Sequence, residues 1–403
     1  MNRRSLLFGA VGISAAALGL SACGTRGETT GTSSGGSKKT AKIGVIAPLS
    51  GDLSAMGLGI RNSVELAIKQ ANAANAIPGW ELVMAAEDDQ ATPDVGANAA
   101  TKLSSDPDVI GVVGTLNSGV SQGVQPILDA KKIVQVSPAN TGDYLTKGSD
   151  IANPKRPHAN YFRVCTVDSI QGPFAAQYVF DSGIKKVAVV NDKKPYGQGL
   201  AAAFAAKFKE LGGEVVGEET AVKQEDFGTV ITSIKGKAPE LVYYGTEYQL
   251  AGPFSRALKA AGLNVPVMGG DGIFDQQFID KAGSTSNGDL ATSVGAPVES
   301  LDSAKKYVSD YSAAGYKDGY SAYGAYAYDA ANAIIEGLKT SLKDAADVAG
   351  ARQATIDAVG KVSFDGATGK VGFDEFGDAV AKVLTVYKVT GGKWAPEKTG
   401  ELG

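Results

Sequence analysis

Residues 109–122 have the sequence VIGVVGTLNSGVSQ, which combines a buried strand, a tight turn and the start of a helix. The apolar run ends at Gly114, and a helical pattern begins near Ser118. The first amide groups of a helix have no partner within the helix, and the helix dipole makes this end positive. The stretch therefore predicts an anion site with the Ser118 hydroxyl beside it, which suits a carboxylate.

A second apolar run, IVQVSPANT at residues 133–141, ends in small polar residues that leave backbone groups and the Thr141 hydroxyl free. Two parallel strands that open on one crevice would place both stretches beside a single ligand. Taken singly, each stretch is also compatible with an ordinary strand end, in which Ser118 caps a helix and Thr141 belongs to a loop. The pattern leaves both interpretations open.

The bulk composition is that of a globular protein with two or three domains. The chain has 403 residues, of which 43% are hydrophobic and 20% are charged. The net charge of -4 comes from 43 acidic and 39 basic residues spread along the chain, without a basic block. Nucleic-acid binding is therefore disfavoured.

Short apolar runs alternate with helical patterns in two successive series, which predicts an α/β fold with mainly parallel sheets. In the first series, strands are expected at 43–48, 80–86, 109–114 and 133–138, and helices at 61–74, 94–103 and between 118 and 131. A proline-broken stretch, 150–160, separates the two series. In the second, strands are expected at 186–191, 214–219, 241–245, 266–269, 291–295, within 371–378 and at 383–389, and helices at 200–211, 227–234, 254–261, 274–282, 303–314 and 323–338. Two lobes with a cleft between them form a binding architecture.

The N-terminus resembles a bacterial lipoprotein signal. Residues 1–23 have a basic start, an apolar segment too short to span a membrane, and the ending Leu-Ser-Ala-Cys. Cys23 would carry the lipid, and the adjacent arginines Arg3 and Arg4 leave both general and twin-arginine export open. Residues 24–41, rich in Gly, Ser and Thr, are expected to form a flexible tether.

Catalytic chemistry is poorly supplied. The single histidine, His158, is expected on the surface, so neither a Ser-His-Asp site nor a histidine-rich metal site is favoured. The stretch GLGIRN at 57–62 departs from a dinucleotide fingerprint because Asn62 replaces the third glycine; its small residues would instead admit a ligand or the facing lobe. We expect no cofactor and no metal.

Three further groups have structural interpretations. Cys165 lies in an apolar run and is expected to be a buried, inert thiol. The acids of residues 374–378 lack the spacing of a calcium loop and fit a hairpin turn. Those of residues 87–89 could bind a metal but better fit a solvated loop.

Seven short motifs, specific only in combination, occur in order along the body of the chain: IAPLSG at 46–51, GVVGTLNS at 111–118, VSPANT at 136–141, DSIQGP at 168–173, DKKPYGQG at 192–199, VYYG at 242–245 and MGGDG at 268–272. With them, the chain from Lys42 onward resembles the type I periplasmic binding proteins of ATP-binding-cassette transport, in the branch that binds leucine, isoleucine and valine. The resemblance implies two Rossmann-like lobes that are joined by three crossovers and close on an amino acid. The lobes would comprise residues 42–165 with 296–382, and 166–295 with 383–403.

The same resemblance implies roles for individual residues. Ser118, the Ala139 backbone and Thr141 would hold the ligand carboxylate, with Thr141 also facing the ammonium. Asp271 stands where the family has a glutamate that pairs with the ammonium. Further wall positions of the site are Leu116, Tyr196, which closes the pocket from the second lobe, and Tyr328.

Departures from the family pattern concern specificity. Met56 replaces an aromatic residue, and Asn140 replaces a small apolar one. Glu247 stands in place of a wall tyrosine, where a second carboxylate would favour a ligand with an extra donor or positive charge. Alternatively, Glu247 points to solvent and Tyr248 supplies the wall. Two positions where the family can have a disulfide are occupied by Ala91 and Asn117.

The function expected from these observations is that of a monomeric, lipid-anchored, extracytoplasmic receptor, which is not an enzyme. It would capture an amino acid, branched-chain or more polar, and deliver it to an ATP-binding-cassette permease. One alternative is a sensory module for a signalling partner. Another is a nucleotide-using enzyme, which Asn62 disfavours.

Overall fold

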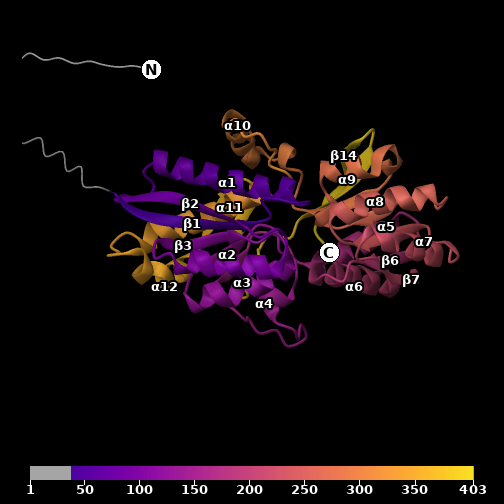
Figure 1. Cartoon of the computed structure of the whole chain (residues 1–403), viewed down its shortest axis with the longest axis horizontal. Coiled ribbons are helices and arrows are strands. Elements are labelled where there is room, and N and C mark those ends of the chain that lie inside the picture. The colour runs from indigo at the N-terminus through magenta and orange to yellow at the C-terminus, as the bar shows by residue number, and fades with distance from the viewer. Residues whose placement is uncertain (1–37, 403) are drawn as a thin grey trace, which may run out of the picture. The chain divides into compact units, whose positions relative to one another are not determined.

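The computed structural model describes residues 38–402 and contains two main β-sheets with helices on both faces (Figure 1). The predicted signal segment, residues 1–23 with Cys23, and the tether up to residue 37 lie outside the described residues. We call the sheet formed by the N-terminal strands, with its helices, the first lobe, and the other sheet with its helices the second lobe.

The sheet of the first lobe has the order β2-β1-β3-β4-β5, with all its pairs parallel. Its strands are β1 (Lys39–Ala47), β2 (Trp80–Asp88), β3 (Val109–Gly114), β4 (Val134–Ser137) and β5 (Tyr161–Arg163). Its helices are α1 (Ser54–Ala73), α2 (Pro93–Ser105), α3 (Ser118–Ala130), α4 (Tyr144–Lys147), α11 (Gly324–Ser341) and α12 (Val348–Val359), with α10 (Lys305–Ala313) beside α1. Figure 1 shows α11 and α12, late in the chain, lying with the N-terminal strands.

Alternating side chains of the strands explain why helices cover both faces of this sheet. Ile46 belongs to a cluster with the buried faces of α2 and α3, whereas its neighbour Val45 belongs to the cluster that contains α1 and α11. Every residue of β3 is buried, as its continuous apolar run predicts.

The sheet of the second lobe has the order β14-β13-β10-β9-β8-β6-β7. Its strands are β6 (Lys186–Asn191), β7 (Glu214–Thr220), β8 (Leu241–Gly245), β9 (Val267–Gly269), β10 (Leu290–Val294), β13 (Leu384–Thr390) and β14 (Lys393–Gly400), of which β13 and β14 pair antiparallel. Its helices are α5 (Asp168–Asp181), α6 (Pro195–Glu210), α7 (Phe227–Lys235), α8 (Tyr248–Ala260) and α9 (Gln276–Ala282). Successive residues of β8 again face opposite sides: Tyr243 stacks on Phe204 of α6, and Tyr244 contacts Phe254 of α8.

The α/β fold with two lobes and mainly parallel sheets is therefore confirmed. The strands of the first lobe lie between residues 39 and 163, and those of the second between 186 and 294 and between 384 and 400. A small hairpin of β11 (Ser363–Gly366) and β12 (Gly369–Gly372) precedes the turn at residues 374–378, where the Asp374 amide donates to the Asp378 carbonyl at 2.9 Å. The exact lobe boundaries at 165/166, 295/296 and 382/383 remain predictions.

The glycines of residues 57–62 lie in close contact with the backbone of their own lobe, and not with the facing lobe as expected. A Cβ on Gly57 would lie 1.9 Å from the Pro48 carbonyl oxygen, and one on Gly59 would lie 2.5 Å from that of Tyr320. Neither approach leaves room for a side chain. The glycines thus allow the start of α1 to pack closely against two loops.

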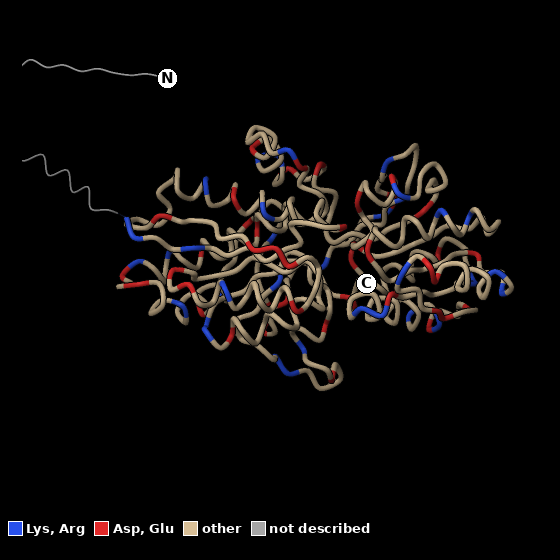
Figure 2. The backbone as a smooth tube through the Cα atoms, viewed as in Figure 1, with Lys and Arg blue, Asp and Glu red and all other residues tan. Residues whose placement is uncertain are grey.

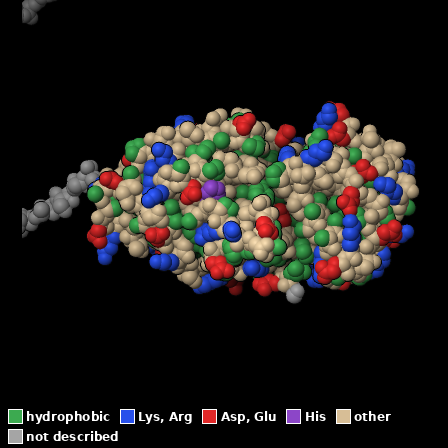
Figure 3. All heavy atoms as spheres, turned by 90° about the horizontal axis from the view of Figure 1, so that it is seen from below, with side chains coloured by type: hydrophobic (Ala, Val, Ile, Leu, Met, Phe, Trp, Pro, Cys, Tyr) green, Lys and Arg blue, Asp and Glu red, His purple; other side chains and the backbone are tan. Residues whose placement is uncertain are grey.

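The charged side chains do not gather in a block of one sign. Figure 2 shows Lys and Arg alternating with Asp and Glu along both lobes, and the face in Figure 3 carries both signs interspersed. His158 is partly exposed, with Nδ1 2.9 Å from Asp129 Oδ2. Cys165 is buried, as predicted, and burial raises the pKa of its thiol.

None of the helices between residues 38 and 402 has the length and apolar character needed to cross a membrane. In the same range, no group of three or more His, Cys, Asp or Glu side chains is arranged to hold a metal ion.

The expectation of a solvated loop at residues 87–89 is wrong for Asp89, which is fully buried. Its Oδ1 accepts a hydrogen bond from the Ala91 amide at 2.8 Å, and its Oδ2 has no partner among the described residues. Burial raises the pKa of Asp89 from 3.8 to about 7, although the Ala91 hydrogen bond opposes this.

We expect Asp89→Asn to stabilise the protein above pH 7 but not near pH 4. The unfolded chain loses the Asp89 proton near its usual pKa of 3.8 and the folded chain near 7, so the free energy of unfolding falls as the pH rises through this window. The amide does not titrate, which should give a gain on the order of 2–4 kcal/mol at high pH. Denaturant unfolding at several pH values measures it; a gain that does not depend on pH would contradict the buried-acid account.

Candidate functional site

A small cavity, containing about 260 Å³ of space between atoms, lies where loops of the two lobes meet. The first lobe contributes residues from α1, from the turn after β3, from the loop after β4 and from the start of α11. The second contributes residues from the starts of α6 and α8 and from the turn after β9. The lining residues are Met56, Leu116, Asn117, Ala139, Tyr196, Glu247, Gly272 and Tyr323.

The structure brings most of the sequence-predicted residues to this cavity. Five of them line it: Met56, Leu116, Ala139, Tyr196 and Glu247. Five others are buried and lie one or two positions along the chain from a lining residue: Ser118, Asn140, Thr141, Tyr248 and Asp271.

Tyr328 is placed elsewhere. Its hydroxyl donates to Gln70 Oε1 at 2.5 Å, and its ring contacts Tyr307 of α10. The aromatic residue at this side of the cavity is Tyr323, which directly precedes α11. Tyr323 was not predicted as a site residue from the sequence. Asn117 and Gly272 also line the cavity and were not predicted as site residues, although they lie in the motifs GVVGTLNS at 111–118 and MGGDG at 268–272.

The possible carboxylate-binding groups lie at the first turn of α3 and in the loop after β4. Ser118 is the first residue of α3, and its buried Oγ accepts from the Gly142 amide at 3.3 Å. Thr141 Oγ1 is buried and makes no hydrogen bond of good geometry among the described residues, although it lies beside the buried Asp168 carboxylate, whose pKa burial raises and the Thr141 hydroxyl lowers. A buried hydroxyl without a partner is unfavourable, so a ligand group that bonds to it would stabilise the site.

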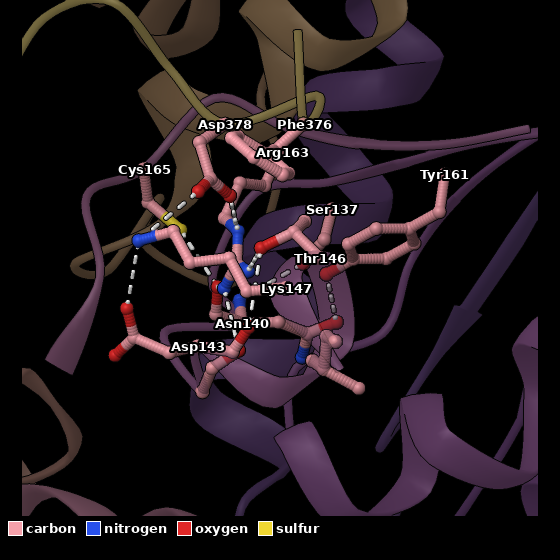
Figure 4. Close-up of polar contacts among 12 residues, drawn as sticks. Ser137, Asn140, Asp143, Thr146, Lys147, Tyr161, Arg163, Cys165, Phe376 and Asp378 are labelled. Atoms are coloured by element: carbon pink, nitrogen blue, oxygen red, sulfur yellow. Dashed lines mark hydrogen bonds and ion pairs between the residues drawn. The ribbon is translucent and has the colours of Figure 1, made fainter. Parts of the chain in front are cut away.

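The loop after β4 is held from behind by Arg163, which is fully buried (Figure 4). Its Nη1 donates to the Asn140 and Gly142 carbonyls at 2.7 and 3.0 Å, and its Nε donates to Asp378 Oδ1 at 2.7 Å. Lys147 Nζ lies 3.8 Å from the other oxygen of Asp378. The guanidinium therefore fixes the backbone on both sides of Thr141.

The Asn140 side chain also supports this loop. Its Nδ2 donates to the Leu116 carbonyl at 2.9 Å, and its Oδ1 accepts from the Tyr161 hydroxyl at 3.1 Å. The bond to Leu116 connects the loop after β4 with the turn after β3, and the bond from Tyr161 connects the same loop with β5.

Asp271 provides a buried carboxylate directly behind the lining ring of Tyr196. Its Oδ1 accepts from the Tyr196 hydroxyl at 2.8 Å and from Gln171 Nε2 at 3.0 Å, and its Oδ2 accepts from the Tyr323 hydroxyl at 2.8 Å. Burial raises the pKa of Asp271, whereas these three hydrogen bonds lower it. A carboxylate offers about four acceptor positions, so one remains for a further donor.

Gly272 permits this arrangement. A Cβ at Gly272 would lie 2.9 Å from the Tyr196 ring, and the Gly272 amide donates to the Tyr196 hydroxyl at 2.9 Å. A larger residue would displace the ring that closes this side of the cavity.

Glu247, the residue before α8, is also buried at the cavity. Its Oε1 accepts from Asn117 Nδ2 of the first lobe at 2.7 Å, and its Oε2 pairs with Lys194 Nζ at 2.9 Å. Although burial lowers the pKa of Lys194, the Glu247 and Asp192 carboxylates raise it above its usual value. The first alternative for this region therefore holds, because Glu247 lines the cavity. The second is wrong: Glu247 does not point to solvent, and Tyr248 is not a lining residue but bonds through its hydroxyl to the Asp52 carbonyl of the first lobe.

Hydrogen bonds between the lobes hold the cavity closed. The Tyr248 hydroxyl donates to the Asp52 carbonyl at 2.5 Å, and Ser321 Oγ lies 2.6 Å from Asp275 Oδ2. With the Tyr323–Asp271 and Asn117–Glu247 bonds, they connect the rim and the floor of the cavity. A ligand that touched both lobes would add to these contacts and favour the closed form.

These features define a class of protein: a two-lobed α/β binder of a small solute, with its site at the carboxyl ends of parallel strands. Residues 40–393 match the family described as periplasmic binding protein, so the chain belongs to that family.

Several members of the family are similar along most of their length. A Leu/Ile/Val-binding protein of Rhizobium johnstonii is 32% identical over 353 residues, which cover 87% of this chain and 92% of the relative. The crystal structure of a leucine-binding protein from Thermotoga maritima is 26% identical, with a TM-score of 0.79 over 89% of this chain and 98% of that one. A branched-chain amino acid transporter substrate-binding protein from Streptococcus pneumoniae, in complex with isoleucine, is 28% identical, with a TM-score of 0.78 over 90% and 99% of the chains.

Proposed function

We propose that this protein captures a small amino acid in the cavity between its lobes and delivers it to an ATP-binding-cassette permease. The observation that carries the proposal is the juxtaposition, at one cavity between the lobes, of the N-terminus of α3 with the Ser118 hydroxyl, the Thr141 hydroxyl that lacks a partner among the described residues, and a buried carboxylate. A zwitterion that leaves water needs donors at one end and an acceptor at the other, or its burial costs several kcal/mol.

In this proposal the ligand carboxylate lies at the first turn of α3, where Ser118, the Ala139 backbone and Thr141 receive it. The ammonium takes the remaining acceptor position of Asp271. Met56, Leu116, Tyr196 and Tyr323 surround the ligand side chain, and their apolar surface suits an aliphatic or small polar group. An amino acid ligand is supported by the similarity to a Leu/Ile/Val-binding protein and to a substrate-binding protein in complex with isoleucine.

The rest of the proposal concerns location and partners. The family supports an extracytoplasmic location and a role in solute binding rather than catalysis. Attachment to the membrane through a lipid on Cys23 rests on the sequence of residues 1–23, and the monomeric state is an expectation.

Calorimetric titration of the purified protein, freed of co-purified ligand by unfolding and refolding, tests the proposal. We expect at least one of the twenty standard amino acids to bind with a Kd of about 10 µM or tighter, whereas a sugar and a nucleotide give no heat. Binding of the nucleotide but of no amino acid would refute the proposal.

A further inference from the structure

Two residues that line the cavity from different lobes present hydrogen-bond acceptors. They are the Glu247 carboxylate and the Asn117 side-chain amide, and both residues line the cavity. The other lining side chains, those of Met56, Leu116 and Ala139 among them, are mostly apolar. Because the hydroxyls of the lining residues Tyr196 and Tyr323 are bonded to Asp271, polar selection of the ligand side chain depends on Glu247 and Asn117.

The orientation of the Asn117 amide follows from its partner. Glu247 Oε2 pairs with the Lys194 ammonium at 2.9 Å, and a carboxylate in such a pair only accepts hydrogen bonds. The group of Asn117 that lies 2.7 Å from Glu247 Oε1 must therefore be the NH₂. This leaves Asn117 Oδ1 as a buried acceptor without a partner among the described residues.

The charge of Glu247 is already balanced. Lys194 Nζ lies 2.9 Å from Glu247 Oε2 and 3.9 Å from Asp192 Oδ2, and burial together with Glu247 raises the pKa of Asp192 to about 7, so below that pH the lysine serves mainly Glu247. The Asn117 NH₂ and Gln249 Nε2 supply further hydrogen bonds to the Glu247 carboxylate. A ligand cation is thus not needed to bury Glu247, whereas the free lone pair of Asn117 needs a donor of any charge.

We propose that the preferred amino acid carries a neutral hydrogen-bond donor, a hydroxyl or an amide NH₂, on a short side chain, and that Asn117 Oδ1 and Glu247 accept from it. This inference rests on the proposed function, because it assumes that the ligand lies in this cavity. Since the Asn117–Glu247 hydrogen bond joins the two lobes, a donor placed there also stabilises the closed form.

Two pairs of ligands with nearly equal shape isolate the donor: threonine against valine, and asparagine against leucine. A site built to hydrogen-bond a ligand group rejects the analogue without it, so we expect the polar member of at least one pair to bind roughly tenfold tighter or more. Titration of the unmodified protein measures this, with lysine and ornithine as the cationic arm.

Each outcome of the titration bears on the proposal. Tighter binding of valine and leucine than of their polar counterparts would overturn the inference while leaving the proposed function intact. Tightest binding of a cationic amino acid would overturn the neutral character of the donor. Binding of no amino acid would refute the proposed function and this inference with it.

The variant Asn117→Leu assigns the effect to its residue. It removes the acceptor at similar volume and also the Asn117–Glu247 bond between the lobes, so the affinity for every ligand should fall, but that for the polar member of each pair roughly tenfold more than that for valine or leucine. Gln353→Leu, on an exposed position of α12, is the matched control and should leave both affinities unchanged. An unchanged preference in a folded Asn117→Leu protein would overturn the role of Asn117; if that variant does not fold, the ligand pairs still decide the question.

Discussion

Replacing Asp271 with alanine should abolish the binding of amino acids while the protein remains folded. The truncation would remove the fully buried carboxylate that faces the ligand ammonium in the proposed binding mode. Loss of one partner from a buried, hydrogen-bonded charge pair costs about 2–5 kcal/mol, so the affinity should fall at least ~30-fold. Calorimetric titration measures this loss, and circular dichroism checks the fold.

The variant Asp271→Asn provides the matched comparison, because it keeps the size of the side chain and its amide oxygen can still accept from Tyr196 and Gln171, whereas the NH₂ in place of Oδ2 cannot accept from Tyr323 or from an ammonium. It should lose affinity for the amino acid but bind the corresponding acid without the amino group as well as the unmodified protein does. Retained affinity for the amino acid in both variants would refute the ammonium assignment.

The dependence of affinity on pH follows from the same group. Burial raises the pKa of Asp271, and only the ionised form pairs with an ammonium. Affinity should therefore fall as the pH is lowered through this raised pKa. In Asp271→Asn, that part of the pH dependence should be absent.

Replacing Arg163 with methionine should strongly lower the free energy of unfolding of the protein. The guanidinium is completely buried, and its removal would leave the Asp378 carboxylate buried without its hydrogen-bonded cation, with Lys147 Nζ 3.8 Å away. Breaking a buried ion pair on one side costs about 3–5 kcal/mol. Chemical denaturation measures the free energy of unfolding directly.

The double variant Arg163→Met with Asp378→Asn serves as the control for the unpaired charge. Because the double variant removes both charges of the Arg163–Asp378 pair, neither is left buried without its partner, and it should be destabilised less than Arg163→Met alone. A loss below about 1 kcal/mol in Arg163→Met would contradict the view that this pair holds the loop after β4.

Most of the fold could be predicted from local patterns, because buried parallel strands are continuous apolar runs. The runs at residues 109–114 and 241–245 are β3 and β8 without a change of boundary. The helix α5 was missed because Pro173 lies inside it and its apolar residues show little helical periodicity. The edge strand β14 was missed because most of its residues are exposed and it contains no apolar run. Only its pairing with β13 defines it as a strand.

The site could be predicted where short motifs carry it, as at Ala139 and Tyr196. Local sequence patterns do not predict hydrogen bonds between residues that are far apart along the chain. Gln171 reaches Asp271 across 100 positions, and Tyr323 reaches it across 52. Whether Glu247 faced the cavity or solvent depended in the same way on Asn117 and Lys194, which come from other elements.

The most direct test of the account is a crystal structure of the protein with its amino acid bound. The account predicts that the ligand lies between the lobes, with its carboxylate at Ser118 and Thr141 and its ammonium within hydrogen-bond distance of Asp271 Oδ2. A ligand bound elsewhere, or one whose amino group does not face Asp271, would contradict it.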